Sequence, residues 1–249
     1  MTLELFDQRW LTYRRVLDHN LMEHQEVSQA TETAIRAWLQ QRPAPAKPLR
    51  MVDLGCGDLA LLVPLLRQLP LADYVGLDLS ASVLERAAAA LGPVAYPCRW
   101  IEGDLLAWAC ADPASDGGTV DLIHTAFAVH HLDEQGKQAF LRGCLARLAP
   151  DGLLVWADVF RPADESHDNY INRYIQRVRH SWQKLTSAEQ ESLIDHLSGH
   201  DLPADREAIV RTATDLGWQW QWLWQGSHNA EAVAALRPQG RSRASAAGS

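Results

Sequence analysis

Along residues 48–160, short apolar runs alternate with longer segments in which apolar residues recur at helical spacing. The apolar runs predict five strands, at residues 51–54, 74–77, 98–101, 120–126 and 153–159. The helices expected in this part of the chain cover residues 59–69, 80–91 and 137–148. Strands joined by helices of this length need crossover connections, so the pattern predicts a doubly wound α/β fold with a mostly parallel sheet.

Helical patterns also lie on both sides of this region. Residues 5–39 predict two helices, and the proline-rich residues 43–48 form a stiff connection to the first strand. Residues 161–216 form an insertion that is far longer than one crossover helix. We expect this helical insertion and the N-terminal helices to act together as a lid over the sheet.

The C-terminal part of the pattern completes the sheet. Tryptophan occupies every second position from Trp218 to Trp224, the period of a strand, and its four rings are expected to pack on one face. Residues 229–236 are expected to form the last of seven strands, although their alanine and glutamate content also permits a helix. The predicted units are a helical segment at 1–47, an α/β domain at 48–236 and a disordered tail at 237–249.

Composition and charge narrow the classes of function. The chain has 31 acidic and 23 basic residues and a net charge of −8, which excludes a general affinity for nucleic acid. Its four cysteines are scattered without a C-x-x-C pair, so we expect neither a metal site nor a disulfide framework. We find no targeting segment and no apolar run of membrane-spanning length, and expect a cytoplasmic protein that does not act on membranes.

Acidic and glycine residues gather where the predicted strands end. Asp53 precedes a Gly-x-Gly turn at residues 55–57, whose glycines allow a ligand to approach the backbone closely. Asp78 ends the next strand, where a carboxylate can accept hydrogen bonds from ribose hydroxyls. Because the carboxyl ends of parallel strands share one edge of the sheet, these residues predict a site for an adenosine-containing cofactor.

Five motifs occur in order along this region, and together they resemble those of the class I S-adenosylmethionine-dependent methyltransferases. The motifs are Val52–Gly57, Gly76–Ser80, Gly103–Leu105, Asp121–Leu132 and Leu148–Leu154. The resemblance covers roughly residues 48–160 and implies a Rossmann-like methyltransferase fold. It also implies transfer of a methyl group from S-adenosylmethionine to an oxygen or nitrogen of a small molecule, leaving S-adenosylhomocysteine. The later motifs have no role in a dinucleotide-binding dehydrogenase, which the glycine turn alone would permit.

The resemblance also implies which residues bind the cofactor. The methionine end would lie against the glycine turn and Asp53, the ribose against Asp78, and the adenine against Leu79, Asp104 and Leu105. Backbone contacts near the carboxylate and sulfonium would come from the residues after the fourth strand. The full set is Asp53, Gly55, Cys56, Gly57, Asp78, Leu79, Asp104, Leu105, Thr125, Ala126 and Phe127. The chain departs from the family pattern after Gly57, where Asp58 and Leu59 replace the usual x-Gly, so contacts there are open.

Candidates for a general base lie at the ends of the fourth and fifth strands: His130, His131 and Asp158. A histidine at the second of these positions often serves structure in the family, and proximity of the reactants alone can suffice for transfer. His24 could line the pocket or cap a helix. The later His167 is a further candidate base.

A predicted helix in the insertion carries Tyr170, Arg173, Tyr174 and Arg177 on one face. Two arginines and two tyrosines could bind an anionic small molecule, although a solvated helix with buried aromatic rings explains the same pattern. Two other functions stay open: a nucleic-acid or protein methyltransferase, and a non-catalytic regulatory domain that binds S-adenosylmethionine. We expect a monomer or a homodimer.

Overall fold

The computed structural model describes residues 3–42 and 47–240. The helices are α1 (Leu3–Asp18), α2 (His24–Gln40), α3 (Val63–Leu66), α4 (Ala81–Leu91), α5 (Leu105–Cys110), α6 (Glu134–Arg147), α7 (His167–Ser181), α8 (Ser187–His200) and α9 (Arg206–Asp215). The strands are β1 (Leu49–Leu54), β2 (Leu71–Asp78), β3 (Cys98–Glu102), β4 (Val120–Ala126), β5 (Leu148–Arg161), β6 (Ala204–Asp205), β7 (Trp218–Gln225) and β8 (Glu231–Pro238). Two short 3-10 helices, η1 (Pro113–Asp116) and η2 (Val129–His131), flank β4.

The strands form one open sheet in the order β3-β2-β1-β4-β5-β8-β7, with the two-residue β6 paired to β5. The first five strands are parallel, whereas β8 runs antiparallel to both β5 and β7. The order reverses between β1 and β4, so the ends of these strands flank the switch point at which ligands bind in such sheets. The predicted α/β class, the mostly parallel sheet and the strand identity of residues 229–236 are confirmed.

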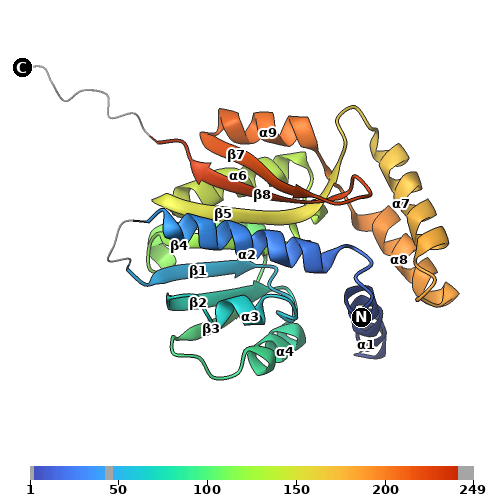
Figure 1. Cartoon of the computed structure of the whole chain (residues 1–249), viewed down its shortest axis with the longest axis horizontal. Coiled ribbons are helices and arrows are strands. Elements are labelled where there is room, and N and C mark those ends of the chain that lie inside the picture. The colour runs from blue at the N-terminus through green and yellow to red at the C-terminus, as the bar shows by residue number, and fades with distance from the viewer. Residues whose placement is uncertain (1–2, 43–46, 241–249) are drawn as a thin grey trace, which may run out of the picture.

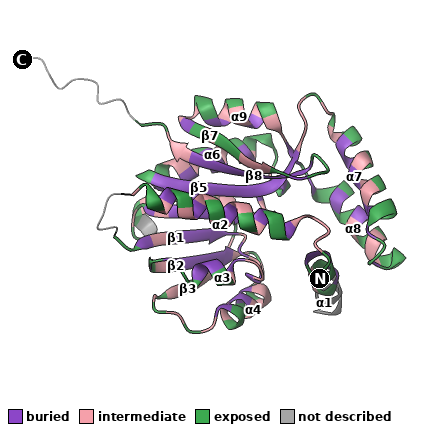
Figure 2. Cartoon of the chain, in the orientation of Figure 1, coloured by how far each residue is buried: buried purple, intermediate pink, exposed green. Residues whose placement is uncertain are grey.

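Helices cover both faces of the sheet (Figure 1). One hydrophobic cluster joins α5, α6 and α9 to one face, with Phe140, Trp156 and Trp218 among its largest buried side chains. The other cluster joins α2, α3 and α4 to the opposite face around Trp38 and Tyr74. Figure 2 shows the consequence: the central strands are almost wholly buried, as a parallel sheet between two helical layers requires.

A third cluster lies at one end of the sheet, where Figure 1 shows α1, α7 and α8 together. It is attached to the sheet by a buried ion pair. Glu231 of β8 is fully buried and accepts from Arg177 of α7 at 2.6 and 2.9 Å, while Tyr174 donates to it at 2.9 Å. A second nitrogen of Arg177 donates to the carbonyl of Leu21, at 2.7 Å. These bonds connect the segment between α1 and α2, helix α7 and the sheet.

The structure corrects the predicted helix at residues 59–69. Leu59 adopts a positive φ of 58°, so the chain turns there, and regular helix begins four residues later at Val63. Asp58, which precedes the position of the missing third glycine, caps this turn by accepting from the amide of Ala60 at 3.1 Å. The short polar side chain therefore stabilises a turn in place of the first helical turn.

Three further predictions need correction. The alternation of the tryptophans is broken by a register shift between Trp222 and Trp224, so Trp224 packs with the α2 side of the sheet instead of joining Trp218. Within the insertion at 161–216, α7 and α8 belong to the third cluster, but Ile209 of α9 packs into the sheet core. Strand β8 extends to Pro238, past the start of the predicted tail, and residues 241–249 lie outside the described part.

Among the described residues, none of the helices combines the length and the apolar character that a bilayer crossing demands.

We expect the substitution Arg177→Met to lower the free energy of unfolding by about 3 kcal/mol, because it leaves the buried Glu231 carboxylate without its cationic partner. Arg179→Met is the matched control on the same helix. Its partner Glu191 is 60% exposed, so its loss should cost less than about 1 kcal/mol. Urea denaturation measures both. Equal effects of the two substitutions would contradict a structural role for the buried pair, and adding Glu231→Gln to Arg177→Met should recover part of the loss.

Candidate active site

The loop after β1 forms the first part of the site. Gly55 and Gly57 have φ values of +71° and +56°, which favour glycine, and a Cβ on Gly55 would lie 2.6 Å from the Cβ of Ala128. The amides of Gly55 and Cys56 donate to the carbonyl of Leu77 at 2.8 and 3.0 Å. The end of β1 is thereby held against the end of β2, with a stretch of backbone free of large side chains.

Asp78 connects this loop to the end of β2. Its carboxylate accepts from the amides of Gly57 at 3.0 Å and Ser80 at 3.1 Å. Burial raises the pKa of Asp78 above its ordinary value, and the two amides oppose that shift. Leu79 is 72% exposed at the surface beside it, so its side chain is available to a flat apolar ligand.

Asp104 and Leu105 begin α5 next to these residues. The amide of Gly103 donates to the Asp78 carbonyl at 2.9 Å, which places the end of β3 beside the end of β2. One oxygen of Asp104 caps α5 by accepting from the amide of Ala107 at 2.7 Å. The sequence motifs at Asp78 and Asp104 thus come together at one edge of the sheet.

Asp53 is buried at the end of β1 and already has two side-chain partners. Its oxygens lie 2.7 Å from Nδ1 of His124 and 3.1 Å from the hydroxyl of Tyr74. It still lines a cavity of about 90 Å³ beside the glycine loop, which we call the loop cavity. Cys56 lines the same cavity, and burial raises the pKa of its thiol, so it remains protonated.

A second cavity of about 330 Å³ lies between α1, α7, α8 and the segment after β4, and we call it the lid cavity. Its lining is mostly apolar and includes Val178 of α7, Trp182 directly after α7, and Leu193 of α8. Three residues line both cavities: Tyr13, His24 and Phe127. The two cavities are therefore neighbours, and these three side chains mark the boundary between them.

His24 is the most buried of the three boundary residues, with 3% of its surface exposed. Its ring lies 4.9 Å from that of Phe127, and no hydrogen bond within the described residues reaches its Nδ1. Burial lowers the pKa of His24 to about 4, so the ring is neutral at physiological pH. The prediction that His24 lines a pocket agrees with this geometry.

The residues after β4 divide into structural and cavity-lining groups. The hydroxyl of Thr125 is fully buried and donates to the carbonyl of Leu54 at 2.8 Å, which ties β4 to β1. Ala126 and Phe127 line the loop cavity. Phe127 has a positive φ of 51°, but its amide donates to the carbonyl of Ala157 and is not available to a ligand.

The structure corrects the assignment of Asp158 as a candidate base. Asp158 is 1% exposed and lines neither cavity; it accepts from the amides of Val129, His130 and Val159 and from the indole of Trp156 at 2.9–3.1 Å. Nδ1 of His130 lies 2.5 Å from Oδ1 of Asp158. Burial would raise the pKa of Asp158, but His130 and the N–H donors lower it below its ordinary value. A carboxylate that accepts hydrogen bonds from this many donors fixes the positions of the neighbouring residues.

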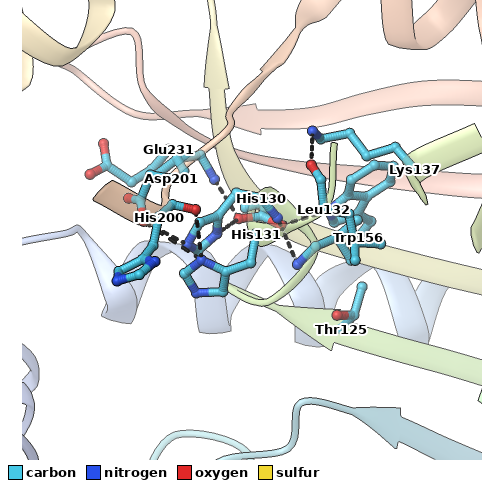
Figure 3. A network of polar contacts seen from close by, with 12 residues as sticks. Thr125, His130, His131, Leu132, Lys137, Trp156, His200, Asp201 and Glu231 are labelled. Atoms are coloured by element: carbon cyan, nitrogen blue, oxygen red, sulfur yellow. Dashed lines mark hydrogen bonds and ion pairs between the residues drawn. The ribbon is translucent and has the colours of Figure 1, made fainter. Parts of the chain in front are cut away.

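His130 and His131 both line the lid cavity, and Asp201 lies beside them (Figure 3). Burial alone would lower the pKa of His130, but the Asp158 carboxylate reverses that shift and raises it. Burial and the neighbouring His130 lower the pKa of His131 to about 4. These side chains form a polar wall in a largely apolar cavity. His167 lies behind this wall, where its Nε2 is 2.8 Å from the Asp201 carbonyl.

The arginines of the predicted anion-binding face of α7 are bound by carboxylates of the protein itself. Arg173 binds Glu165 and the carbonyls of residues 228 and 229, while Arg177 is taken up by Glu231. Tyr170 is fully buried and lines neither cavity. Only Tyr174 reaches the lid cavity, and its hydroxyl is bonded to Glu231. A carboxylate binds each arginine: Glu165 lies 8 positions from Arg173, and Glu231 lies 54 positions from Arg177, which local spacing cannot reveal.

Several residues of the site could not be identified from the sequence. Tyr13 carries no signal beyond helical spacing, and His124 is one polar residue in an apolar strand. His196 and Asp201 lie in an insertion without a family pattern, and only the recurrence of histidine at 196 and 200 marks them.

We expect His24→Leu to weaken the pH dependence of stability. Folded His24 stays neutral down to about pH 4, whereas in the unfolded chain it takes up a proton near 6.5. The unfolded state therefore binds more protons between these values, and stability falls as the pH drops through them. From about pH 7 to about pH 5 the variant should lose about 1–2 kcal/mol less stability than the wild type. Denaturation at both pH values tests this, with the exposed His180→Asn as control; a wild-type slope in His24→Leu would contradict it.

The chain was compared with known proteins. Residues 52–154 match a family model described as a methyltransferase domain. A trans-aconitate 2-methyltransferase of Pseudomonas aeruginosa is 34% identical over 126 residues, 47% of this chain and 42% of that protein. A ubiquinone biosynthesis O-methyltransferase of Rhodopseudomonas palustris is 30% identical over 161 residues, 61% of this chain and 57% of that protein. The matched region thus spans less than two thirds of either relative.

Solved structures agree in fold. The plantazolicin methyltransferase BpumL, in complex with SAH, superposes with a TM-score of 0.63 at 15% identity, covering 93% of this chain and 90% of that one. Residues 52–154 are thus similar to a methyltransferase domain, and the sheet order and glycine loop are those of the methyltransferase fold.

Proposed function

We propose that the protein transfers a methyl group from S-adenosylmethionine to an oxygen or nitrogen atom of a small molecule bound in the lid cavity. The observation that carries this proposal is the adjacency of the two cavities, which share Tyr13, His24 and Phe127. A donor at the glycine loop and an acceptor beneath the lid would meet at this boundary. Such an arrangement supplies the alignment that methyl transfer requires.

The residues at the strand ends fit this cofactor. Gly55 and Gly57 present backbone to the loop cavity, where Asp53 supplies a negative charge for the amino group of the methionine end. Asp78 lies next to Gly57 and would accept from the ribose hydroxyls, while the exposed Leu79 would pack on the adenine. Asp104 and Leu105 would then bind the edge of the adenine. The bound cofactor supplies a methyl group on a positively charged sulfur.

The boundary residues would suit a cation on the donor side. His24 is neutral because burial lowers its pKa to about 4, so it places no positive charge beside the sulfonium. The rings of His24 and Phe127 lie 4.9 Å apart and would help to exclude water from the path of transfer. The polar wall of His130, His131 and Asp201 faces the acceptor, where it can hold the reacting group and receive its proton.

The lining of the lid cavity indicates the class of acceptor. Neither lysine nor arginine is among its described lining residues, and most of them are apolar. An acceptor with an apolar body and one polar group fits this surface better than a multiply charged anion. The names of the curated relatives, a trans-aconitate 2-methyltransferase and a ubiquinone biosynthesis O-methyltransferase, support a small-molecule acceptor, and the second supports an oxygen atom.

We expect Asp78→Ala to weaken binding of S-adenosylhomocysteine by about 10–100-fold, because the ribose loses a charged acceptor and the loop loses its anchor at Gly57. Isothermal titration calorimetry of S-adenosylmethionine and S-adenosylhomocysteine measures the effect. Glu85→Ala is the control, since it removes one negative charge from an exposed position on the adjacent α4. No binding by the wild type, or equal binding by both variants, would overturn the proposed cofactor site.

We expect Leu193→Trp to fill the lid cavity and to lower kcat/KM by about 10-fold or more without changing the affinity for S-adenosylhomocysteine. The acceptor is found first by screening small phenols, carboxylic acids and amines for S-adenosylhomocysteine release. Ser198→Trp on the exposed side of α8 should leave turnover unchanged. Turnover in Leu193→Trp at the wild-type level would place the acceptor elsewhere. A protein that binds the cofactor but turns over with none of these acceptors would favour a regulatory role.

A further inference from the structure

Three histidines surround one carboxylate oxygen in the wall of the lid cavity. Oδ1 of Asp201 lies 3.6 Å from Nε2 of His130, 3.7 Å from Nδ1 of His131 and 3.8 Å from Nε2 of His196. The four residues come from the segment after β4, from α8 and from the residue that follows α8, and all of them line the cavity. Figure 3 shows His130, His131 and Asp201 directed toward one another.

These contacts are too long for hydrogen bonds. Asp201 is 9% exposed, yet no hydrogen bond reaches its Oδ1 among the described residues. A buried carboxylate oxygen without a donor is costly, although three nitrogen atoms lie within reach of it. Something that all four groups can bind at once would remove that cost.

The separations fit ligands that share a metal ion. Around a tetrahedral zinc ion with bonds of about 2.0–2.1 Å, neighbouring ligand atoms lie about 3.3 Å apart, closer than the 3.6–3.8 Å between Oδ1 of Asp201 and the three histidines. The ligand atoms of His130, His131 and Asp201 all lie within 4.8 Å of one another. Small side-chain movements would therefore complete the site. His131 would give up its contact of 3.3 Å with the carbonyl of His200.

His130 also has the support that metal-bound histidines have. Its Nδ1 faces Asp158 at 2.5 Å, and Asp158 is fixed by the backbone amides of residues 129, 130 and 159. A carboxylate that accepts from Nδ1–H leaves Nε2 to act as a ligand and fixes the direction of the ring. The Asp158 side chain, which the sequence suggested as a base, takes this supporting role.

We propose that His130, His131 and Asp201, with His196 as a fourth ligand, bind a divalent transition-metal ion such as zinc in the wall of the lid cavity. Imidazole and carboxylate ligands favour such an ion over magnesium or calcium, which prefer oxygen ligands alone. Displacing one of the four ligands opens a position toward the cavity, and an anionic oxygen of the acceptor would fill it. The site needs no cofactor, so the proposal goes beyond the proposed methyl transfer.

The test uses the untagged full-length protein after treatment with a chelator. Titration with Co²⁺ should give saturable binding with the strong visible absorption of a tetrahedral or five-coordinate ion, and Zn²⁺ should displace it at one equivalent. Asp201→Asn and His196→Ala should each weaken binding by about 10–100-fold or more. His180→Ala on α7 and His228→Ala between β7 and β8 remove histidines outside the cluster and should leave binding unchanged.

Folding and the cofactor site are measured separately. Thermal melting and calorimetry with S-adenosylhomocysteine should show that both cluster variants remain folded and bind it as the wild type does. A failure of S-adenosylhomocysteine binding in the wild type would count against the proposed function and leave the metal result intact. Absence of saturable Co²⁺ and Zn²⁺ binding by the wild type, or equal affinity in the cluster variants and the controls, would overturn the metal site.

Discussion

The arrangement of the candidate site depends on the buried carboxylate of Asp158. This side chain lies near the end of β5, yet its hydrogen bonds hold the segment that follows β4, through the amides of Val129 and His130. A buried charge must be satisfied by donors, so the conformation of that segment cannot change without a large cost in free energy. The direction of His130 follows from this constraint, and with it the polar wall of the lid cavity.

Charge pairs attach the lid helices α1 and α7 to the sheet and to its loops. Arg177 of α7 and Glu231 of β8 form a buried pair, and Arg14 of α1 lies 3.3 Å from Asp58 in the glycine loop. Asp58, the residue before the missing third glycine of the family pattern, thus contacts the N-terminal helix. The lid cavity is consequently enclosed by elements that are each bonded to the sheet or to its loops.

Much of the fold could be predicted from sequence because a parallel sheet buries continuous apolar runs and places its acids at one edge. Asp78 and its partner Gly57 lie where the motif order put them. The lid could not be predicted in the same way. The local spacing of Arg177 is that of an anion-binding residue. Its partner Glu231 is 54 positions away, so the local pattern does not reveal the pair. His196 and Asp201 likewise acquire meaning only when α8 returns to the segment after β4.

A comparison of the acids at this edge shows what the sequence leaves open. Asp158 and Asp201 both lie beside His130, but the oxygens of Asp158 accept from five groups, whereas no hydrogen bond reaches Oδ1 of Asp201 within the described part of the chain. A carboxylate whose acceptor positions are filled by the protein can only orient its neighbours. One with an unfilled oxygen beside a cavity can bind something else. The sequence singles out Asp158 because it lies near a strand end. The hydrogen bonds show that Asp201, and not Asp158, has an oxygen left to bind a ligand.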